Sequence, residues 1–401
     1  MRIGIDARFY GTLGKGLGRY TEKLIEHLEE VDQENEYIIF LRRENFSEYQ
    51  PKNARFTKVI AQYAWYGFAE QTVFVFLLYR KKLDLVHFPH FNVPLLYVKK
   101  FIVTIHDLIL VHYPTVRNTT RFSLVYWCKF FVYRTVIASA IYRSERVITV
   151  SHFTKKDIIL QYPKSRGKIS VTYEATDTYC QFLAPSEEER LFVRLGLCPQ
   201  PIVDSNVSYR DIIQPYFLYV GNAYPHKNLS ILFAVAKAFP TYQLVLVGRE
   251  DFFYTRLKKE AHQAGIPNLL FAGFLSDREL SVMYRFARIY IFPSLYEGFG
   301  LPPLEAMARG TPVVSSQRGS LPEILGDAPR YFDPTSETSL LSAIREVERD
   351  SVLRSEMQNR GYQQVVRYDF RRMATETALL YRDAFQHKKT FHGTTTQSTA
   401  Q

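Results

Sequence analysis

Short apolar runs alternate with helix-like segments along nearly the whole chain, and this alternation limits the possible folds more than any other feature. The clearest helix-like segment is GRYTEKLIEHLEE at residues 18–30, where apolar residues recur at helical spacing. The expected strands are residues 2–6, 37–41, 83–88, 101–107 and 146–151 in the first half, and residues 216–221, 242–248, 268–273, 289–294 and 311–316 in the second. Strands that alternate with helices are typical of parallel sheets covered by helical layers. Both halves are therefore predicted to be α/β units of the Rossmann-like, doubly wound kind.

The length of 401 residues favours two domains, each large enough to bury its own core. Polar and proline-containing stretches around one short helix place the boundary after the first domain. The polar end HKKTFHGTTTQSTAQ is typical of a disordered tail. The expected parts are a first domain at residues 1–174, a linker at 175–214, a second domain at 215–368, a C-terminal helix at 369–387 that returns to the first domain, and a tail at 388–401.

The cysteines and the start of the chain bear on the cellular compartment. Cys128, Cys180 and Cys198 are odd in number, far apart and outside any C-x-x-C or His-Cys spacing. This argues against a disulfide framework or a zinc site. The start MRIGIDARFYG leads directly into a strand-like run, without the basic and apolar regions of a signal peptide. We therefore expect a reducing, cytoplasmic location.

The positive charge is concentrated in the first half of the chain. Of the formal net charge of +11, residues 1–175 contribute 26 Lys and Arg against 16 Asp and Glu, a balance of +10. Residues 121–146 mix seven aromatics with basic side chains, which favours peripheral contact with an anionic membrane. Lys129 and Arg134 argue against a spanning helix, and a buried helix is the alternative, because the aromatics fall on nearly every side of a helical wheel. No motif that reads nucleic acid accompanies the charge, so nucleic acid is not an expected partner.

Two glutamates, Glu297 and Glu305, lie eight positions apart in PSLYEGFGLPPLEAMARG. The prolines of this stretch begin an expected helix, and Gly310 ends it. Glu297 is therefore expected in a strand-to-helix loop at the carboxyl edge of the second sheet, where such sheets bind ligands. Glu305 is expected one turn into the helix, whose N-terminus favours an anion such as a diphosphate. Two carboxylates so placed suit the hydroxyls of a sugar nucleotide, and a plain loop carboxylate with a solvated helix carboxylate is the alternative.

This stretch resembles the E-x7-E signature of the retaining family-4 glycosyltransferases of GT-B fold, also called glycosyltransferase group 1. The resemblance covers about residues 1–385 and continues in consistent order through further motifs at residues 16–24, 104–109, 148–158, 219–229, 272–280 and 319–334. It implies two Rossmann-like doubly wound domains that face each other across a cleft. The first domain would bind the acceptor, and the second would bind the nucleotide sugar.

The resemblance assigns a role to each residue around the two glutamates. Glu305 would hold the ribose hydroxyls of the donor nucleotide. Glu297 would contact hydroxyls of the transferred sugar near its anomeric carbon. The backbone of four consecutive residues would line the diphosphate, namely Gly298, Phe299, Gly300 and Leu301.

Two further positions are expected to take part in catalysis. Lys227, which follows GNAYPH, would meet the charge of the leaving diphosphate, and a solvated loop lysine is the alternative. Many family members have an arginine where this chain has Asn222, so His226 or an arginine from elsewhere would substitute for that phosphate cation. His106, in TIHDL, would hydrogen-bond the donor sugar or else be a structural turn residue. Asp107 beside it is either a helix cap or an active group.

The glycine-rich loop GTLGKGLGRY completes the expected site. The resemblance implies that Gly16 and Gly18 form a flexible flap over the donor phosphate and the acceptor. Arg19 is either a contact of that site or a solvated residue of the first helical turn. The chain lacks G-x-G-x-x-G followed by an acidic residue, which argues against an NAD-dependent dehydrogenase.

We expect neither a metal nor a cofactor, because the sequence has no D-x-D and no His/Asp cluster with ligand spacing. The family implies retention of configuration, and we expect attack from the same face, since no carboxylate nucleophile is evident. YVGNAYPHKNL is more similar to bacterial mannosyltransferases of surface-polysaccharide assembly than to sucrose or glycogen enzymes. GDP-mannose is therefore the expected donor, and a polyprenyl-diphosphate-linked sugar or another glycan the expected acceptor, in O-antigen, capsule or exopolysaccharide synthesis. A non-catalytic nucleotide-sugar-binding subunit is the alternative, given Asn222.

Overall fold

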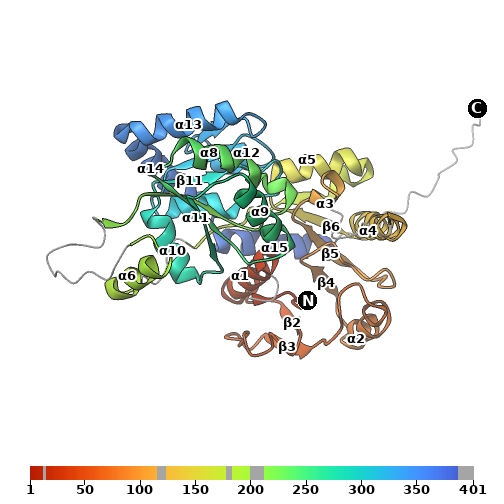
Figure 1. Cartoon of the computed structure of the whole chain (residues 1–401). Helices are drawn as coiled ribbons and strands as arrows, with labels where there is room; N and C mark the ends of the chain where they lie inside the picture. Colours follow the sequence, from red (N-terminus) through yellow and green to blue (C-terminus); the bar gives the residue numbers. More distant parts are fainter. Residues whose placement is uncertain (12–14, 115–122, 178–182, 199–211, 387–401) are drawn as a thin grey trace, which may run out of the picture.

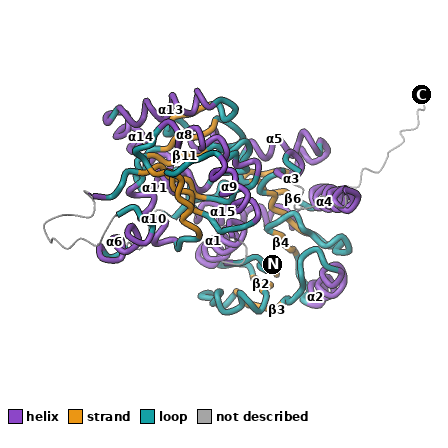
Figure 2. The backbone as a smooth tube through the Cα atoms, in the orientation of Figure 1, coloured by secondary structure: helices purple, strands orange, loops and turns teal. Residues whose placement is uncertain are grey.

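The structure is a computed structural model that describes residues 1–11, 15–114, 123–177, 183–198 and 212–386. The described residues form two units, each a parallel sheet flanked by helices (Figure 1, Figure 2). The expected tail at 388–401 lies outside the described residues, as do parts of the expected linker at 175–214.

Seven parallel strands form the sheet of the first unit, in the order β3-β2-β1-β4-β5-β6-β7. The strands are β1 (Arg2–Asp6), β2 (Glu36–Leu41), β3 (Phe56–Ile60), β4 (Leu85–Phe88), β5 (Phe101–Ile105), β6 (Arg146–Thr149) and β7 (Ile169–Val171). The central strands are largely apolar, and every residue of β4 and β5 is buried. Continuous burial of this kind requires helices on both faces of the sheet.

Successive residues of the strands enter two separate cores, as the two-residue period of a strand dictates. In β2, Ile39 packs with α1 (Lys15–Val31) and α15 (Phe370–Gln386) on one face. Its neighbours Ile38 and Phe40 pack on the other face, against α2 (Val75–Arg80), α4 (Ser123–Arg143) and α5 (His152–Gln161). The π-helix η2 (Glu70–Phe74) leads into α2, and α3 (Ile109–His112) follows β5.

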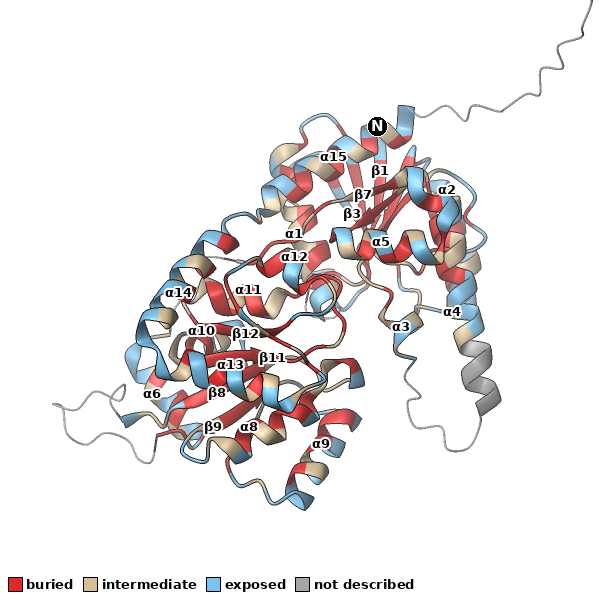
Figure 3. Cartoon of the chain, turned by 90° about the horizontal axis from the view of Figure 1, so that it is seen from above, coloured by how far each residue is buried: buried red, intermediate tan, exposed pale blue. Residues whose placement is uncertain are grey.

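The last helix of the described chain, α15, lies against the first sheet although it follows the second unit in sequence (Figure 3). Its fully buried Tyr381 is hydrogen-bonded through its hydroxyl to Nδ1 of His87 in β4, at 2.7 Å. Met373, Ala374 and Ala384 of the same helix belong to the core that α1 forms with β1 and β2. The C-terminal helix therefore ties the second unit back to the first.

Six parallel strands form the second sheet, in the order β10-β9-β8-β11-β12-β13. The strands are β8 (Tyr216–Val220), β9 (Gln243–Val247), β10 (Leu269–Gly273), β11 (Ile289–Phe292), β12 (Val313–Ser316) and β13 (Arg330–Phe332). The helices of this unit are α6 (Pro185–Arg194), α8 (Leu232–Ala238), α9 (Phe252–Gln263), α10 (Asp277–Phe286), α11 (Leu301–Ala308), α12 (Leu321–Leu325), α13 (Glu337–Arg349) and α14 (Ser351–Val365).

Both sheets have the same doubly wound order, so the predicted fold class is confirmed. The chain reverses its direction of travel between β1 and β4 in the first sheet and between β8 and β11 in the second. Ligands of doubly wound sheets bind outside the carboxyl ends of strands at such switch points. The sequence patterns did not predict β3, β7 and β13, which are edge strands, and two of them have only three residues.

The carboxyl edges of the two sheets meet. Ser151, which follows β6, donates its hydroxyl hydrogen to the Gly298 carbonyl, which follows β11, at 2.6 Å. Glu323 of α12 accepts hydrogen bonds from the backbone N–H groups of His152 and Phe153 at the start of α5, at 2.6 and 2.8 Å. These contacts bring the carboxyl edge of the first sheet against the loop after β11 and against α12.

Candidate active site

An ion pair between the buried Glu297 and the partly buried Lys227 lies at the switch point of the second sheet. Glu297 is in the loop after β11, and Lys227 ends the short 3-10 helix η4 (Pro225–Lys227) after β8. Lys227 Nζ is 2.5 Å from Glu297 Oε1, and the two side chains are only 12% and 9% exposed. The structure thus brings together two predicted catalytic residues that are 70 positions apart in the sequence.

Several contacts hold the Glu297 loop in place. The fully buried Ser320 hydroxyl lies 3.0 Å from the Glu297 carbonyl and 2.9 Å from the Phe299 carbonyl, and it can donate to either. Gly298 is required because a Cβ there would lie 2.0 Å from the backbone oxygen of His106 in the first unit. Gly300 has a φ of +101°, which an L-residue with a side chain rarely adopts. The loop can therefore approach a ligand and the first domain closely.

Helix α11 begins at Leu301, directly after this loop. Its second and third residues are Pro302 and Pro303, which have no N–H group to donate. The amide donors for an anion at this helix start are consequently those of residues 298–301. This is the same segment that the resemblance assigns to the diphosphate, and that assignment stays a prediction.

Glu305 faces the first domain. Its Oε1 accepts a hydrogen bond from Arg19 Nη1 at 2.8 Å, and its Oε2 accepts one from the Tyr284 hydroxyl at 3.0 Å. Arg19 also donates to Asp177 at 2.8 Å, and Lys23 Nζ lies 3.5 Å from the same carboxylate. Both carboxylate oxygens of Glu305, the residue expected to hold the ribose, therefore accept hydrogen bonds from protein groups in this structure.

His106 follows β5 and lies against the Glu297 loop. Its Nδ1 is 2.9 Å from Glu174 Oε1, and its Nε2 is 2.9 Å from the Pro89 carbonyl. Burial lowers the pKa of His106, but the hydrogen bond to Glu174 and the Glu174 charge outweigh it, so the net pKa is raised. With an acceptor at each nitrogen, the ring is held as a double donor. Its contact with a donor sugar remains a prediction.

Asp107, beside His106, accepts the Ile109 N–H at 2.9 Å. The N-cap residue of α3 is Leu108, so this bond shapes the turn before the helix rather than forming an N-cap. Burial raises the pKa of Asp107, and the nearby charge of Glu297 adds to this, whereas His106 and Lys227 oppose it. Asp107 is therefore a further carboxyl group beside the Glu297–Lys227 pair.

The position of Asn222 supplies no positive charge. Its side-chain oxygen accepts the Tyr224 N–H at 3.3 Å, so the side chain shapes its own loop. Burial, with the charge of Lys227, lowers the pKa of His226 to about 4, so this ring is neutral at pH 7. His226 therefore does not replace the phosphate cation that is missing at Asn222. Arg19, from the first domain, is an arginine that lies at the site.

The two glycines of the glycine-rich loop differ. A Cβ at Gly18 would lie 2.0 Å from the Gly11 oxygen and 2.5 Å from the Phe9 oxygen, so only glycine fits there. A Cβ at Gly16 would meet no atom within 4 Å. The flap role of this loop is untested, and residues 12–14 lie outside the described part of the chain.

The sequence patterns did not single out several residues at this site, among them Glu174, Asp177 and Tyr284. Glu174 follows β7, a three-residue strand that the sequence patterns did not predict, so no expected strand end marked it. Asp177 lies within the expected linker, whose composition carries no such signal. Among the described residues, no group of three or more His, Cys, Asp or Glu is arranged to hold a metal ion. Metal independence stays a prediction.

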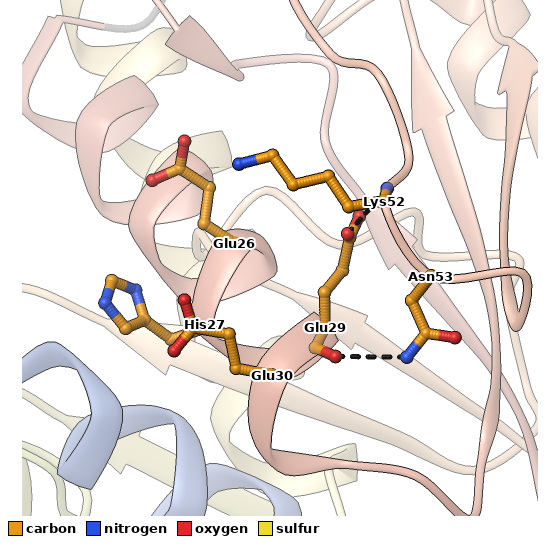
Figure 4. A pocket seen from close by; sticks show the side chains of 6 residues that line it. All are labelled: Glu26, His27, Glu29, Glu30, Lys52 and Asn53. Carbon is orange, nitrogen blue, oxygen red and sulfur yellow. Dashed lines mark hydrogen bonds between the residues drawn. The ribbon is translucent and has the colours of Figure 1, made fainter.

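A separate pocket on the first unit is acidic and lies away from this site (Figure 4). It is lined by Glu26, His27, Glu29, Glu30, Lys52 and Asn53. Glu29 is ten residues along α1 from Arg19, which is about 15 Å of helix. Glu29 is already used there, because it accepts the Lys52 N–H at 2.8 Å and its carbonyl accepts Asn53 Nδ2 at 3.0 Å.

The comparisons with known proteins agree with this geometry. Residues 14–179 match the family described as Glycosyltransferase Family 4, and residues 210–364 match glycosyl transferases group 1. The chain belongs to the group 1 glycosyltransferases. Its structure is similar to sucrose-phosphate synthase from Thermosynechococcus elongatus, with a TM-score of 0.71, 19% identity and coverage of 96% of this chain and 99% of the other. At that identity the likeness shows the GT-B fold alone.

Curated relatives of this glycosyltransferase act in polysaccharide assembly. The O-antigen chain mannosyltransferase RfbU of Salmonella typhimurium is 27% identical over 375 residues, which are 90% of this chain and 94% of the relative. The O-antigen chain mannosyltransferase B of Escherichia coli is 27% identical over 305 residues, which are 74% and 73% of the two chains. These relatives support a glycosyltransferase of surface-polysaccharide synthesis.

Proposed function

We propose that this glycosyltransferase transfers mannose from GDP-mannose to a hydroxyl of a lipid-linked or glycan acceptor, with retention of configuration and without a metal. The observation that carries the proposal is the Glu297–Lys227 pair at the switch point of the second sheet. The names of the O-antigen mannosyltransferase relatives support the choice of sugar and process.

The partly buried Lys227 suits a reaction in which a diphosphate leaves. In the proposed step the bond between the anomeric carbon and the phosphate oxygen breaks, and Lys227 stabilises the charge that develops on that oxygen. Glu297 holds hydroxyls of the sugar ring as the anomeric carbon gains oxocarbenium character. The acceptor oxygen then bonds to the same face of that carbon, and its proton passes to the leaving phosphate.

We assign the two substrates to separate domains, as the family resemblance implies. The donor nucleotide is assigned to the second domain, at residues 215–368, with its ribose at Glu305 and its diphosphate at residues 298–301. The acceptor is assigned to the first domain, at residues 1–174. His106, at the meeting edge of the two sheets, then lies between donor sugar and acceptor.

We place the protein at the cytoplasmic face of a membrane that carries the acceptor lipid. Among the described residues, no helix is both long and apolar enough to cross a bilayer. On α4, Phe131 and Val132 are 72% and 58% exposed beside the exposed Arg134, whereas Ile137 and Ile141 are fully buried. An outward face that combines apolar and basic side chains favours contact with anionic lipid.

The membrane proposal predicts that Lys129→Glu/Arg134→Glu weakens binding to vesicles of anionic phospholipid in a sedimentation assay. The matched control is Arg256→Glu/Lys259→Glu on α9, which makes the same change of charge in the second domain. Equal loss in both variants would mean that net charge alone governs binding. Unchanged binding of the α4 variant would exclude these two residues as the contact.

The test of the transferase proposal is release of nucleoside diphosphate from GDP-, UDP- and ADP-sugars, with and without a lipid-linked acceptor and EDTA. We expect acceptor-dependent release of GDP from GDP-mannose, unaffected by EDTA. Loss of release in EDTA would exclude metal independence, and release from another donor would correct the sugar. Binding of donors without turnover on any acceptor would favour the alternative of a nucleotide-sugar-binding subunit, which Asn222 in place of the usual cation suggests.

A further inference from the structure

A row of half-buried aromatic rings lies at the switch point of the first sheet. The aromatic row consists of Phe9, Trp65, His90 and Phe91, which come from the loops after β1, β3 and β4. Phe9 stacks on Trp65 with ring centroids 4.2 Å apart and planes 8° apart. His90 is 5.3 Å from Phe9 and 4.0 Å from Phe91, so the rings form one continuous row.

The aromatic row borders the candidate active site on two sides. The Pro89 carbonyl, one residue before His90, accepts the hydrogen bond of His106 Nε2. On the other side, the Phe9 carbonyl packs against Gly18, where a Cβ would lie 2.5 Å from it. The donor assignment uses the switch point of the second sheet, so the switch point of the first sheet is left for the second substrate.

A buried charged network holds the three loops of the row together. The fully buried Glu70 accepts hydrogen bonds from Arg8 at 2.6 Å, from Asn92 at 2.8 Å and from the Tyr66 N–H at 2.8 Å. Arg8 adjoins Phe9, Tyr66 adjoins Trp65, and Asn92 adjoins Phe91, so one carboxylate fixes a neighbour in each loop. Burial of charged groups costs free energy. The buried charges of Arg8 and Glu70 orient the loops at the carboxyl ends of the strands.

The loop of Trp65 also carries backbone strain. Tyr66 has a φ of +62°, an unusual conformation for a bulky residue, and its side chain is 65% exposed. Strain of this kind persists where the surroundings enforce it, and it gathers at ligand sites. Here the Glu70 hydrogen bond to the Tyr66 N–H enforces it.

Trp65 Nε1 is buried and has no acceptor among the described residues. The half-buried His90 ring offers a second N–H group. His90 Nδ1 accepts the Asn92 N–H at 3.4 Å, and burial, with the charge of His106, lowers the pKa of His90 to about 3, so the neutral ring carries its hydrogen on Nε2. An indole N–H that is sheltered from water normally finds a partner, and a hydroxyl oxygen supplies one.

We propose that the aromatic row is the subsite for a pyranose ring of a glycan acceptor. The C–H faces of a sugar pack on aromatic rings, and its hydroxyls accept hydrogen bonds from Trp65 Nε1 and His90 Nε2. The rings of the row carry no charge, and the neighbouring Arg42 guanidinium already lies over Trp65, 4.9 Å from its ring centroid, so we expect GDP not to bind here. A polyprenyl chain does not fit either, because it would leave Trp65 Nε1 without an acceptor. The inference rests on the proposed function and assigns its acceptor: a sugar ring, rather than a bare lipid phosphate, is what the first domain recognises.

Tryptophan fluorescence reads this subsite directly, because the chain has two tryptophans and Trp127→Phe leaves Trp65 as the sole one. The probes are methyl pyranosides of mannose, galactose and N-acetylglucosamine, α-linked mannobiose, and GDP. We expect a saturable change of Trp65 emission with at least one saccharide and none with GDP. A response to GDP alone, or to no saccharide, would overturn the inference.

Kinetics of the transfer reaction give a second readout. Trp65→Ala should raise KM for a glycan acceptor at least tenfold, while Kd for GDP, measured by calorimetry, changes less than twofold. The control is Phe76→Ala, another aromatic of the first domain, which is 62% exposed on α2 and should change neither value. Trp65→Phe keeps a ring but removes the N–H, so an intermediate KM is expected. A circular dichroism spectrum and a melting temperature like those of the wild type show that each variant is folded.

The sugar subsite and the transferase function can be refuted separately. If the wild-type enzyme turns over a glycan acceptor and Trp65→Ala retains its KM, the subsite is wrong and the proposed function stands. If the wild type transfers no sugar although saccharides change Trp65 emission, the sugar subsite stands and the transferase proposal fails.

Discussion

The direction in which Arg19→Ala changes nucleotide affinity separates two interpretations of the nucleotide site. In the structure its guanidinium donates to Glu305 at 2.8 Å and to Asp177 at 2.8 Å, with the arginine 31% and the glutamate 18% exposed. If Glu305 holds the ribose, the nucleotide has to displace Arg19 from the carboxylate. Arg19→Ala removes that competitor and should tighten nucleotide binding.

The size of this effect follows from the exposure of the pair. A partly exposed ion pair contributes about 1 kcal/mol after solvent screening. Because 1.4 kcal/mol corresponds to a tenfold change, Kd for GDP should fall about fivefold in Arg19→Ala. Isothermal titration calorimetry with GDP measures this directly. The control is Arg256→Ala on α9, which removes an exposed arginine from a surface ion pair in the second domain.

A weaker nucleotide affinity in Arg19→Ala would refute this reasoning. It would mean that Arg19 leaves Glu305 and contacts the diphosphate once the donor binds, as the substitute for the cation that Asn222 lacks. Tyr284→Phe tests the assignment of Glu305 itself, because it removes a neutral hydrogen bond to Glu305 without changing charge. That variant should bind GDP more weakly in either case, because Glu305 loses a group that orients it.

Two further predictions concern the groups that position the site. The raised pKa of His106 means that its link to Glu174 stabilises the fold fully below about pH 6.5, the ordinary value for histidine, and that this contribution is lost as pH rises through the higher folded pKa. Urea unfolding at pH 6 and pH 9 should therefore show a smaller pH-dependent loss in Glu174→Gln than in the wild type, and an equal loss would contradict the assignment. Ser320→Ala removes the buried hydroxyl between the Glu297 and Phe299 carbonyls and should cost about 1–3 kcal/mol of unfolding free energy. The same assay at pH 7 measures it, and an unchanged midpoint would show that the loop does not depend on this hydroxyl.

Much of the fold could be predicted from local patterns. Central strands such as β5 and β11 are buried on both faces, so their apolar runs stand out between helical segments. Edge strands are harder to predict, because β3 is partly exposed and Lys58 interrupts its short apolar run. The order of strands is also not local information, and it was accessible only through the alternation of strand and helix and through the family resemblance.

The residues of the site likewise differ in how far local sequence patterns reveal them. Glu297 and Glu305 could be found because one short segment carries both, with its glycines and prolines. The pairing of Arg19 with Glu305 joins residues 286 positions apart, and that of His106 with Glu174 joins residues 68 apart. No spacing rule predicts such contacts, because they depend on how the two domains meet.

The aromatic row was missed for a related reason. Phe9, Trp65 and His90 belong to three separate loops, and each is an ordinary aromatic residue in its own context. Only the parallel order β3-β2-β1-β4 brings the ends of those strands to one edge. Glu70 was equally inconspicuous in the sequence, although it holds the three loops together.

The most direct test of the central claim is the rate of acceptor-dependent mannose transfer by Glu297→Gln and Lys227→Met. The control is Glu337→Gln, which changes an exposed glutamate of the same domain. Removal of one preorganised charged group from a catalytic site typically costs about 10²–10³ in kcat. We predict a loss of this size in each of the two variants, with transfer by the control unchanged and GDP still bound by all three. Transfer at the wild-type rate by Glu297→Gln or Lys227→Met would contradict the assignment of the Glu297–Lys227 pair as the catalytic centre.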